Sequence, residues 1–521
     1  MKDLTTSIYH FENLIRGNFL YVDKTEYVWQ LIRPAQEMYF LSRPRRFGKS
    51  LLVSTLEAVF EGKRELFKGL ALHDKPYDWK KHPVIHLDLS NCGVQTPGDL
   101  GKYLTNQLEN IADQFKLQLR GDLLATRFEN LILDVAKQGG TPVILLDEYD
   151  KPILGNIANP RVGEILQVLK EFYSNIKKTE RFLRLVFITG VSKFSHVSLF
   201  SDLNNLTDIT MNPNYAGMLG FTAAEVRECF ADRIPEAAQA NGETGEGVMK
   251  KLFAWYDGYR FSEAETHVCN PVSITKFFAN AFRFSNFWDS TGTPSFLLEL
   301  MRKQSYDHEA ALNDWYDESI FSAYELDSLD ITGLLWQTGY LTIKEIRQEI
   351  TGIQYRLDFP DQEVKQTFMT RLLEYYASVE KGLTLSLIGT LIRAMQNDDL
   401  GGFLTCFQSV LANIDYKLHI PDEKYYQSIF YVVFKLLGIW IEAESCTNEG
   451  RIDAYIRTAR AVYVFEFKLN KTAKRAVGQI IDRRYYERFQ GSGLPVRLIG
   501  VNFDSSKGRI DGWKEKPAPA K

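Results

Sequence analysis

Cysteine is scarce in this sequence and its positions follow no paired spacing. The 521 residues include five cysteines, at positions 92, 229, 269, 406 and 446. Zinc sites and disulfide frameworks need cysteines at short, recurring spacings, which these positions do not provide. The sequence therefore predicts neither kind of site, and a reducing cytoplasm is the expected compartment.

Long apolar runs are also lacking. A membrane-spanning helix needs about 20 consecutive apolar residues, and no stretch approaches that length. The first residues, Met1–Ser7, lack the apolar core of a secretion signal. Hydrophobic residues nevertheless make up 45% of the chain and aromatic residues 13%. This composition predicts a soluble globular protein, and the length of 521 residues predicts two or three domains.

Positive charge is in deficit over the whole chain but not at its C-terminal end. The net charge is −4. From Ile441 onward, 16 Lys and Arg stand against 10 Asp and Glu, which leaves −10 for the first 440 residues. A basic segment on an acidic body indicates a polyanionic partner. A solvated basic surface is the alternative.

The central motif of the sequence, at residues 43–50, lacks one glycine of the phosphate-loop pattern. Residues 43–50 read Arg-Pro-Arg-Arg-Phe-Gly-Lys-Ser, so Arg43 replaces the first glycine of the phosphate-loop pattern G-x-x-x-x-G-K-[ST]. Apolar residues before and after predict a strand, a tight loop and a helix that begins at Lys49. In such a loop, backbone N–H groups surround the phosphates, Lys49 reaches the β/γ oxygens and the Ser50 hydroxyl ligates Mg²⁺. A basic loop that caps a helix is the alternative.

Apolar strands alternate with helical segments in the first 212 residues. The expected elements are strands at 38–41, 83–89, 142–146 and 183–188, and helices at about 98–117, 121–137 and 161–178. Uninterrupted apolar strands between helices indicate a parallel sheet covered on both faces. The predicted fold class is therefore α/β, of the P-loop NTPase type.

Two carboxylates follow the apolar strand at 142–146. In a phosphate-loop protein an aspartate at this place holds the Mg²⁺ shell, and an adjacent glutamate orients and deprotonates the attacking water. We assign these roles to Asp147 and Glu148. Thr189, at the end of the next strand, is placed to contact the γ-phosphate or the water, with an ordinary polar strand end as the alternative.

Two loop arginines have several candidate partners. Arg45 and Arg46 could add positive charge at the γ-phosphate, contact a neighbouring subunit, or form an ion pair with an acidic residue such as Asp23 or Asp150. The sequence reveals no arginine finger that acts across subunits, so it does not decide whether the protein forms a homo-oligomer. The expected nucleotide-binding set is Arg45, Arg46, Phe47, Gly48, Lys49, Ser50, Asp147 and Thr189.

The residues after 212 follow a different pattern. From 213 to 398 they are mainly helical, with a short strand-like piece near 339–343. The aromatic block at 255–261 is expected to be a packed structural corner rather than a base-stacking platform, because it interrupts helices. The expected domains are an ATPase domain at 1–212, a helical lid or middle region at 213–398 and an α/β domain at 399–513, followed by a disordered tail at 514–521.

Two carboxylates and a lysine lie on consecutive strand-like segments near the end of the chain. Glu466 and Lys468 share one strand face because side chains alternate, and a hairpin would bring Asp453 beside them. Burying these charges is costly unless they bind metal or perform chemistry. Carboxylates suit Mg²⁺, with Mn²⁺ as a substitute, and the lysine can act on a scissile phosphate. The alternative is a lysine–glutamate ion pair on an exposed strand.

Taken together, these motifs resemble the AAA-ATPase-like proteins of bacteria and archaea, over nearly the whole chain. The segments that carry the resemblance are 21–25, 42–50, 146–152, 189–193, 200–208, 220–222, 255–261 and 270–273. Arg43 belongs to that family pattern. The resemblance implies an ATPase fold of the additional-strand type, followed by a helical lid region.

The last 120 residues or so resemble the PD-(D/E)xK nuclease superfamily, which supplies the last domain of many members of that family. The motif is Asp453, Glu466 and Lys468, and Arg451-Ile452-Asp453 stands in place of the strict Pro-Asp pair. The resemblance implies a restriction-endonuclease-like α/β domain. It also adds Glu423, on a helix at about 422–437, as a further acidic residue at the metal.

These features predict an ATP-hydrolysing protein with an appended Mg²⁺-dependent nuclease domain. Its partner is nucleic acid, with DNA favoured over RNA, and a basic helix at about 471–488 is the expected backbone-binding face. A solvated helix face is the alternative there. The competing function is a nucleotide-dependent switch whose terminal domain binds a partner without cleaving it.

Overall fold

The computed structural model divides the chain into two compact units, 1–288 with 315–363 and 289–314 with 364–521. The described residues are 1–193, 205–288, 295–304, 306–322, 330–377, 379–380, 382–412, 423–439, 441–448, 451–504 and 509–519. None of the helices in these ranges is long and apolar enough to cross a membrane. The division into domains at 212 and 398 stays a prediction.

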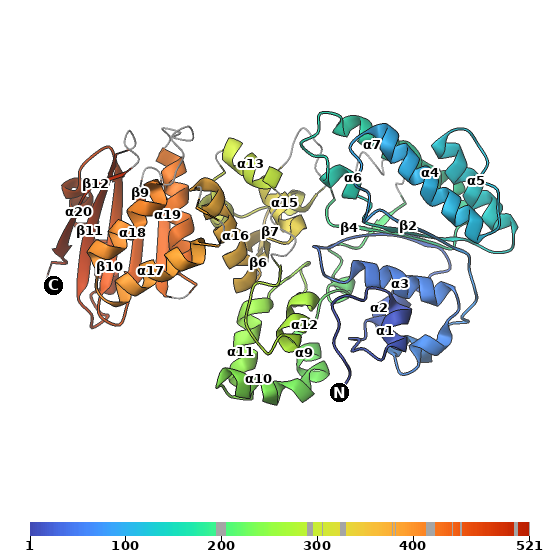
Figure 1. The fold of residues 1–521 in the computed structure, drawn as a ribbon, viewed down its shortest axis with the longest axis horizontal. Coiled ribbons are helices and arrows are strands. Elements are labelled where there is room, and N and C mark those ends of the chain that lie inside the picture. The colour runs from blue at the N-terminus through green and yellow to red at the C-terminus, as the bar shows by residue number, and fades with distance from the viewer. Residues whose placement is uncertain are drawn as a thin grey trace. The chain divides into compact units, whose positions relative to one another are not determined.

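A parallel sheet forms the core of the first unit (Figure 1). Its strands are β1 (Glu37–Ser42), β2 (Val84–Asp88), β3 (Val143–Asp147), β4 (Leu185–Gly190) and β5 (Thr207–Asp208). They are ordered β2-β3-β4-β1-β5, so β4 lies between β1 and β3. This order confirms the predicted additional-strand ATPase fold.

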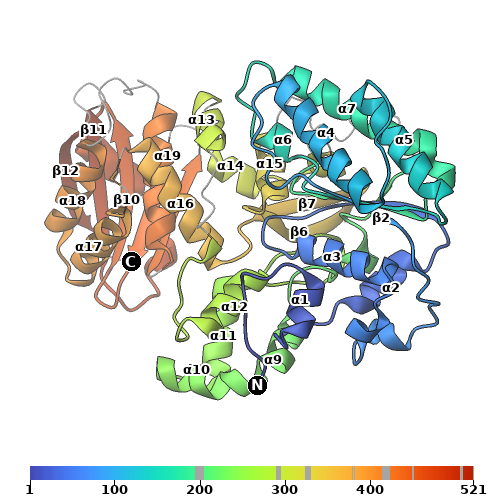
Figure 2. The same cartoon turned by 45° about the vertical axis from the view of Figure 1, so that its right-hand side comes forward.

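Helices cover both faces of this sheet, which explains why its central strands are apolar throughout. Figures 1 and 2 show α4, α5 and α7 on one face and α1, α2 and α3 on the other. The bounds are α1 Phe11–Arg16, α2 Thr25–Ile32, α3 Lys49–Phe60, α4 Pro97–Gln114, α5 Leu124–Lys137, α6 Lys151–Leu154 and α7 Val162–Thr179. Met38, Phe40, Ile144 and Leu146 alternate along β1 and β3 and join the core under α4, α5 and α7.

Where the structure describes the rest of the first unit, it contains helices and one β-hairpin. The helices are α9 Ala223–Cys229, α10 Ile234–Asn241, α11 Gly245–Tyr256, α12 Pro271–Ala279 and α15 Ile331–Thr338. Gly339, with a φ of 88°, ends α15, and the hairpin of β6 (Thr342–Glu349) and β7 (Gly352–Asp358) follows. The strand-like piece expected near 339–343 is therefore the start of a two-stranded element.

A mixed sheet forms the core of the second unit. Its strands are ordered β12-β11-β10-β9-β8, and they are β8 Glu442–Asn448, β9 Arg451–Arg457, β10 Val462–Leu469, β11 Val496–Asp504 and β12 Arg509–Pro517. Strands β10 and β11 are parallel, and the other neighbours are antiparallel. The predicted α/β restriction-endonuclease-like class describes this unit.

Opposite faces of the second sheet bind different helices. The helices of this unit are α13 Ser295–Lys303, α14 His308–Asn313, α16 Gln362–Tyr376, α17 Thr384–Gln396, α18 Leu400–Ala412, α19 Glu423–Leu437 and α20 Ala473–Asp482; α16 begins at the end of the first unit, and α18, α19 and α20 contact the sheet. Phe465 and Phe467 of β10 pack on aromatic rings of α18 and α19. Val464 of β10 lies on the other face, in a core with Val477 of α20.

Two predictions about the end of the chain are wrong. Residues 514–517 are not a disordered tail, because they pair with β11 as part of β12 and gain main-chain hydrogen bonds that their composition does not predict. The basic helix expected at 471–488 covers only Ala473–Asp482. Arg484 has a φ of 57°, which interrupts helical geometry.

Candidate functional site

The phosphate loop connects β1 to α3 through two residues in the left-handed region. Arg46 has a φ of 70° and Gly48 a φ of 97°, and Gly48 is the N-cap of α3. A side chain at Gly48 would be strained at this φ. Backbone N–H groups in such a turn form a concavity that binds anions, as the sequence predicts for this loop.

Lys49 is held by its own loop. Its side chain is buried, and Nζ donates to the carbonyl oxygens of Arg43 at 2.9 Å and Pro44 at 3.0 Å. Burial lowers the pKa of the ammonium group. Nearby carboxylates partly oppose this shift by raising the pKa, and Glu148 has the largest effect among them. The charge of Arg45, which is half-buried, also lowers this pKa, so Arg45 lies close enough to act on the same site.

A carboxylate and a hydroxyl meet where β3 ends and α3 begins. Asp147 is 3% exposed and forms a hydrogen bond with the Ser50 side chain. Burial raises the pKa of this carboxyl, and its Oδ1 is buried with no hydrogen-bond partner in the part of the chain that the structure describes. A hydroxyl beside a buried carboxylate oxygen fits the donor set of Mg²⁺.

Glu148 directly follows the strand and has an unusual backbone conformation. Its φ is 52°, in a region that costs a non-glycine residue about 1 kcal/mol or more and that is common at functional sites. The side chain is 23% exposed, and its Oε2 lies 3.9 Å from Nζ of Lys151. It is thus accessible beside the buried Asp147, as a residue that acts on water must be.

The end of β4 is fixed by two buried side chains. The Thr189 hydroxyl donates to the carbonyl of Leu41 at 2.9 Å and so connects β4 to β1. Asp150, whose pKa is raised by burial, accepts hydrogen bonds from the main chain of Val191 and from both N and Oγ of Ser192. The sequence analysis missed this role of Asp150, because the partners become neighbours only in the folded sheet.

Arg43 is buried between the loop and the aromatic block at 255–261. Its guanidinium carbon lies 4.3 Å from the ring centre of Phe261, and Nη1 donates to the carbonyl of Thr210 at 2.7 Å. Burial lowers the pKa of this arginine to about 9. Phe47 contacts the same block, with ring centres 4.7 Å from Tyr259 and 5.3 Å from Phe261. The predicted packed corner is confirmed, and the phosphate loop is part of it.

Two further loop residues contact the part of the first unit that follows residue 212. A Cβ atom on Gly339 would lie 2.6 Å from Cβ of Pro44, so the backbone after α15 approaches the loop closely. Arg46 donates through Nη1 to the carbonyl of Phe287. Asp23, an expected partner of the loop arginines, instead accepts hydrogen bonds from Thr25 and from the main chain of residue 71.

The second unit buries a carboxylate–lysine pair. Glu466 is fully buried and Lys468 is 5% exposed, with Nζ of the lysine 2.5 Å from Oε1 of the glutamate. In the antiparallel pairing of β9 with β10, Asp453 lies opposite Glu466, which confirms the predicted hairpin. Because the pair is buried, the alternative of an ion pair on an exposed strand does not describe it.

The remaining acidic residues of this centre are placed only by their backbone. Glu423 is the first residue of α19 and Asp453 lies in β9, but their side chains lie outside the described part of the chain. Within that part, no group of three His, Cys, Asp or Glu side chains converges as a metal site would require. Carboxylate oxygens are ligands of the type that Mg²⁺ and Mn²⁺ prefer, and the metal-binding role of Glu423, Asp453 and Glu466 stays a prediction.

A glycine in β11 brings α20 close to this pair. Gly500 lies opposite Glu466, and a Cβ atom there would be 2.4 Å from the carbonyl oxygen of Ala473 and 2.7 Å from N of Val477. The first turn of α20 therefore lies directly on β11 beside the buried carboxylate. An isolated glycine within a strand is the sequence signal of such a close backbone approach.

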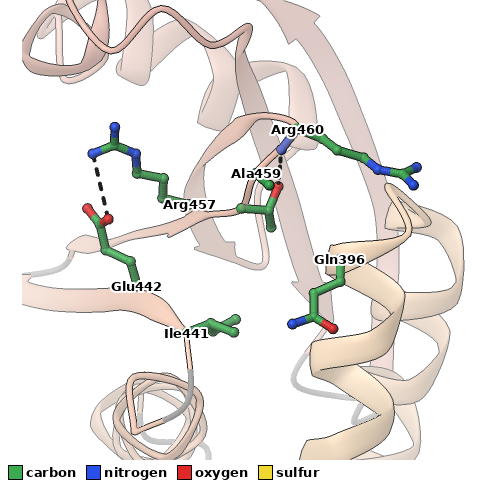
Figure 3. Close-up of a pocket in the computed structure, with 7 residues that line it drawn as sticks. Gln396, Ile441, Glu442, Arg457, Ala459 and Arg460 are labelled. Carbon is green, nitrogen blue, oxygen red and sulfur yellow. Dashed lines mark hydrogen bonds and ion pairs between the residues drawn. The ribbon is translucent and has the colours of Figure 1, made fainter. Parts of the chain in front are cut away.

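An open cavity of about 500 Å³ lies at the opposite end of the same hairpin (Figure 3). Its lining residues are Gln396, Ile441, Glu442, Arg457, Thr458, Ala459 and Arg460. Arg457 pairs with Glu442 at 3.6 Å and lies opposite Val462, at the other end of the ladder from Glu466. The cavity is thus separate from the carboxylate–lysine pair.

The two units define a P-loop NTPase joined to a restriction-endonuclease-like domain. Comparison with known proteins gives the same result: residues 5–200 match a family described as predicted AAA-ATPase, and residues 421–513 match the PD-(D/E)XK nuclease superfamily. The chain belongs to the AAA-ATPase-like family and carries a C-terminal PD-(D/E)XK domain. Such domains generally use a nucleotide and a divalent metal.

Similar proteins include one full-length relative and two solved structures. An uncharacterized protein in the vnfD 5' region of Azotobacter chroococcum mcd 1 is 33% identical over 524 residues, which cover 98% of each chain. The Aeropyrum pernix ORC2 protein has a TM-score of 0.29 at 13% identity, over 68% of this chain and 90% of that one. The ORC1 protein of the same organism, in complex with DNA, has a TM-score of 0.25 at 12% identity, over 66% and 90%. Likenesses this low do not bear on function.

Proposed function

We propose that this protein hydrolyses ATP at its phosphate loop and, with Mg²⁺, cleaves phosphodiester bonds of DNA in its second unit. The observation that carries the proposal is that each unit buries a carboxylate and a lysine at the place its family motif requires. These are Asp147 with Lys49 in the first unit and Glu466 with Lys468 in the second. Buried charges are expensive to retain, which favours chemistry over a purely structural role at both places.

At the phosphate loop, each proposed role follows from a contact. Lys49 would exchange the loop carbonyls for the β/γ oxygens of ATP, and Ser50 and Asp147 would hold Mg²⁺, which neutralises phosphate charge when bound. Glu148 would orient the attacking water and accept its proton. Thr189 would contribute indirectly, because its hydrogen bond to the carbonyl of Leu41 holds the end of β4 against β1.

In the second unit, Asp453 and Glu466 would hold the metal, with Glu423 as a further acidic ligand. The bound metal would supply a hydroxide-like nucleophile and neutralise phosphate charge. Lys468 would leave Glu466 to meet the scissile phosphate, where a cation stabilises the charge that develops in the transition state. The pair at 2.5 Å keeps both charges compensated until then.

The loop contacts support control of the second unit by ATP. Arg46 donates to the carbonyl of Phe287, and the chain leaves the first unit after residue 288. Glu363, the last residue of the first unit, accepts hydrogen bonds from N of Phe287 and, at 2.8 Å, from N of Trp288. Phosphates that draw Arg46 toward the nucleotide would release this segment and so alter access to the nuclease centre.

The cellular setting is also a proposal. The four cysteines with described side chains, at positions 92, 229, 269 and 406, are all free, which supports a reducing cytoplasm. DNA is preferred to RNA as the partner, and a homo-oligomer is compatible with the partly accessible Arg45.

Incubation of the purified protein with labelled DNA and RNA, with and without ATP, Mg²⁺ and Mn²⁺, tests this function. We expect metal-dependent cleavage that responds to ATP, and ATP hydrolysis that persists in Glu466→Gln. No cleavage with any divalent metal, together with retained ATP hydrolysis, would contradict the nuclease and support the nucleotide-dependent switch.

A further inference from the structure

Five exposed basic side chains gather at one end of the second sheet. Three lie just before α20 or in its first turn, and two lie on β12. They are Lys471, Lys474, Arg475, Lys514 and Lys516. In the described ranges of the chain, none of the five forms an ion pair. Among these residues no acidic neighbour neutralises their charges, which are exposed to a ligand.

Three other arginines of this unit are already engaged. Arg484 pairs with Glu487 at 3.6 Å, and Arg488 lies over the ring of Tyr455 at 4.8 Å. Arg497 pairs with Asp398 at 2.7 Å and with a β12 glutamate at 3.2 Å. This contrast singles out the start of α20 and the edge strand, rather than Arg484 after the end of the helix.

Strand register places the β12 lysines beside the candidate nuclease centre. Glu466 lies opposite Gly500 in β11, and Gly500 lies opposite Lys514 in β12. Residues opposite one another point to the same face of a sheet, so Lys514 shares both face and row with Glu466, two strands or about 10 Å away. Lys516 lies opposite Leu498 on that same face.

The first turn of α20 connects these two positions. It lies on Gly500, between the row position of Glu466 and that of Lys514. N of Lys471 donates to Oδ1 of Asn502 at 2.8 Å, and Asn502 lies opposite Lys468. The cations at the start of α20 therefore bridge the distance between the buried pair and the sheet edge.

We propose that these five side chains, the α20–β12 surface, bind the phosphate backbone of the DNA strand that enters the nuclease centre. A regular polyanion matches a row of unpaired cations that begins at the buried pair and ends at an open strand edge. Lysines on edge strands also discourage strand-to-strand pairing, but that role does not require further unpaired cations at the start of α20. The inference rests on the proposed nuclease function and assigns its substrate-binding face.

Salt dependence of DNA binding tests the surface. Fluorescence anisotropy with labelled duplex DNA, on the full-length protein in Ca²⁺ to restrain cleavage, gives the slope of log affinity against log salt. The double variant Lys514→Gln/Lys516→Gln should flatten this slope by about 1.8, since each lost phosphate contact on duplex DNA removes about 0.9. Lys514→Arg/Lys516→Arg should restore it, because arginine keeps the charge.

A matched control lies at the opposite end of the sheet. Arg457→Gln/Arg460→Gln removes two charges at the cavity of Figure 3 and should leave the slope unchanged. An unchanged slope in the lysine double variant, or equal losses in both double variants, would overturn the surface while leaving the nuclease untouched. Failure of the wild type to bind DNA at all would overturn the surface and the proposed function together.

Discussion

The substitution Gly500→Ala should destabilise the second unit and leave ATP hydrolysis unchanged. The added Cβ would lie 2.4 Å from the carbonyl oxygen of Ala473 and 2.7 Å from N and Cγ2 of Val477. Since the oxygen and the nitrogen belong to backbone, α20 must move away from β11. Overpacking in a core costs about 1–3 kcal/mol, and a backbone clash belongs at the upper end of that range.

Gly478→Ala, in the same helix, is the matched control. Gly478 lies inside α20, and no atom is within 4 Å of where its Cβ would be. Alanine in a helix interior is favoured over glycine by about 1 kcal/mol. Both substitutions add one methyl group at the same helix–strand contact, but Gly500→Ala should destabilise the second unit and Gly478→Ala should stabilise it.

Hydrogen exchange of the α20 amides in the full-length protein measures both effects. We expect protection at residues 473–482 to fall about 10- to 100-fold in Gly500→Ala, as a loss of about 1.4–3 kcal/mol requires, and to rise in Gly478→Ala. ATP hydrolysis should be unchanged in both variants, because the phosphate loop belongs to the other unit. Unchanged protection in Gly500→Ala would refute the close contact on which the position of α20 depends.

Further variants test the two centres and the acid response. Lys49→Ala should lose ATP binding or hydrolysis in a phosphate-release assay, whereas Glu148→Gln should bind ATP in calorimetry but hydrolyse it at least 100-fold more slowly; equal turnover in Glu148→Gln would remove its role as base. Lys468→Ala should abolish cleavage on a gel yet retain much of the Mn²⁺ binding, since lysine is not a ligand. Burial lowers the pKa of His308 to about 4 against about 6.5 when unfolded. The free energy of unfolding of the second unit should therefore fall by up to about 1.4 kcal/mol for each pH unit as the pH drops from about 6.5 to 4. His308→Phe should flatten this dependence in urea titrations, and an unchanged pH profile would contradict it.

The sequence was informative where structure is local. The phosphate loop, the strand before Asp147 and the alternation that puts Glu466 and Lys468 on one face all follow from short patterns, and the strand pairing bears out the hairpin. Strand β12 could not be predicted this way, because its Lys, Glu and Pro residues disfavour a strand and only pairing with β11 stabilises it. The end of the basic helix was missed for a similar reason, since no residue type marks the left-handed Arg484.

Contacts between distant segments account for the rest. Nothing near Arg43 in sequence indicates that it lies against Phe261, more than 200 residues away. The same holds for Arg46 and the carbonyl of Phe287. These partners meet only after the sheet and the lid helices have packed. The roles of the nucleotide and metal residues themselves stay predictions.

The central claim is that one chain holds two separate metal centres, one of them a nuclease site. Calorimetric titration of Mn²⁺ into the full-length protein, without nucleotide, tests it most directly. Wild type and Asp147→Asn should both bind Mn²⁺ in the second unit, whereas Glu466→Gln should lose that binding, because an amide oxygen is a poorer ligand than a carboxylate for a hard cation. Equal Mn²⁺ binding by wild type and Glu466→Gln would contradict the claim and leave an ATPase with a binding module.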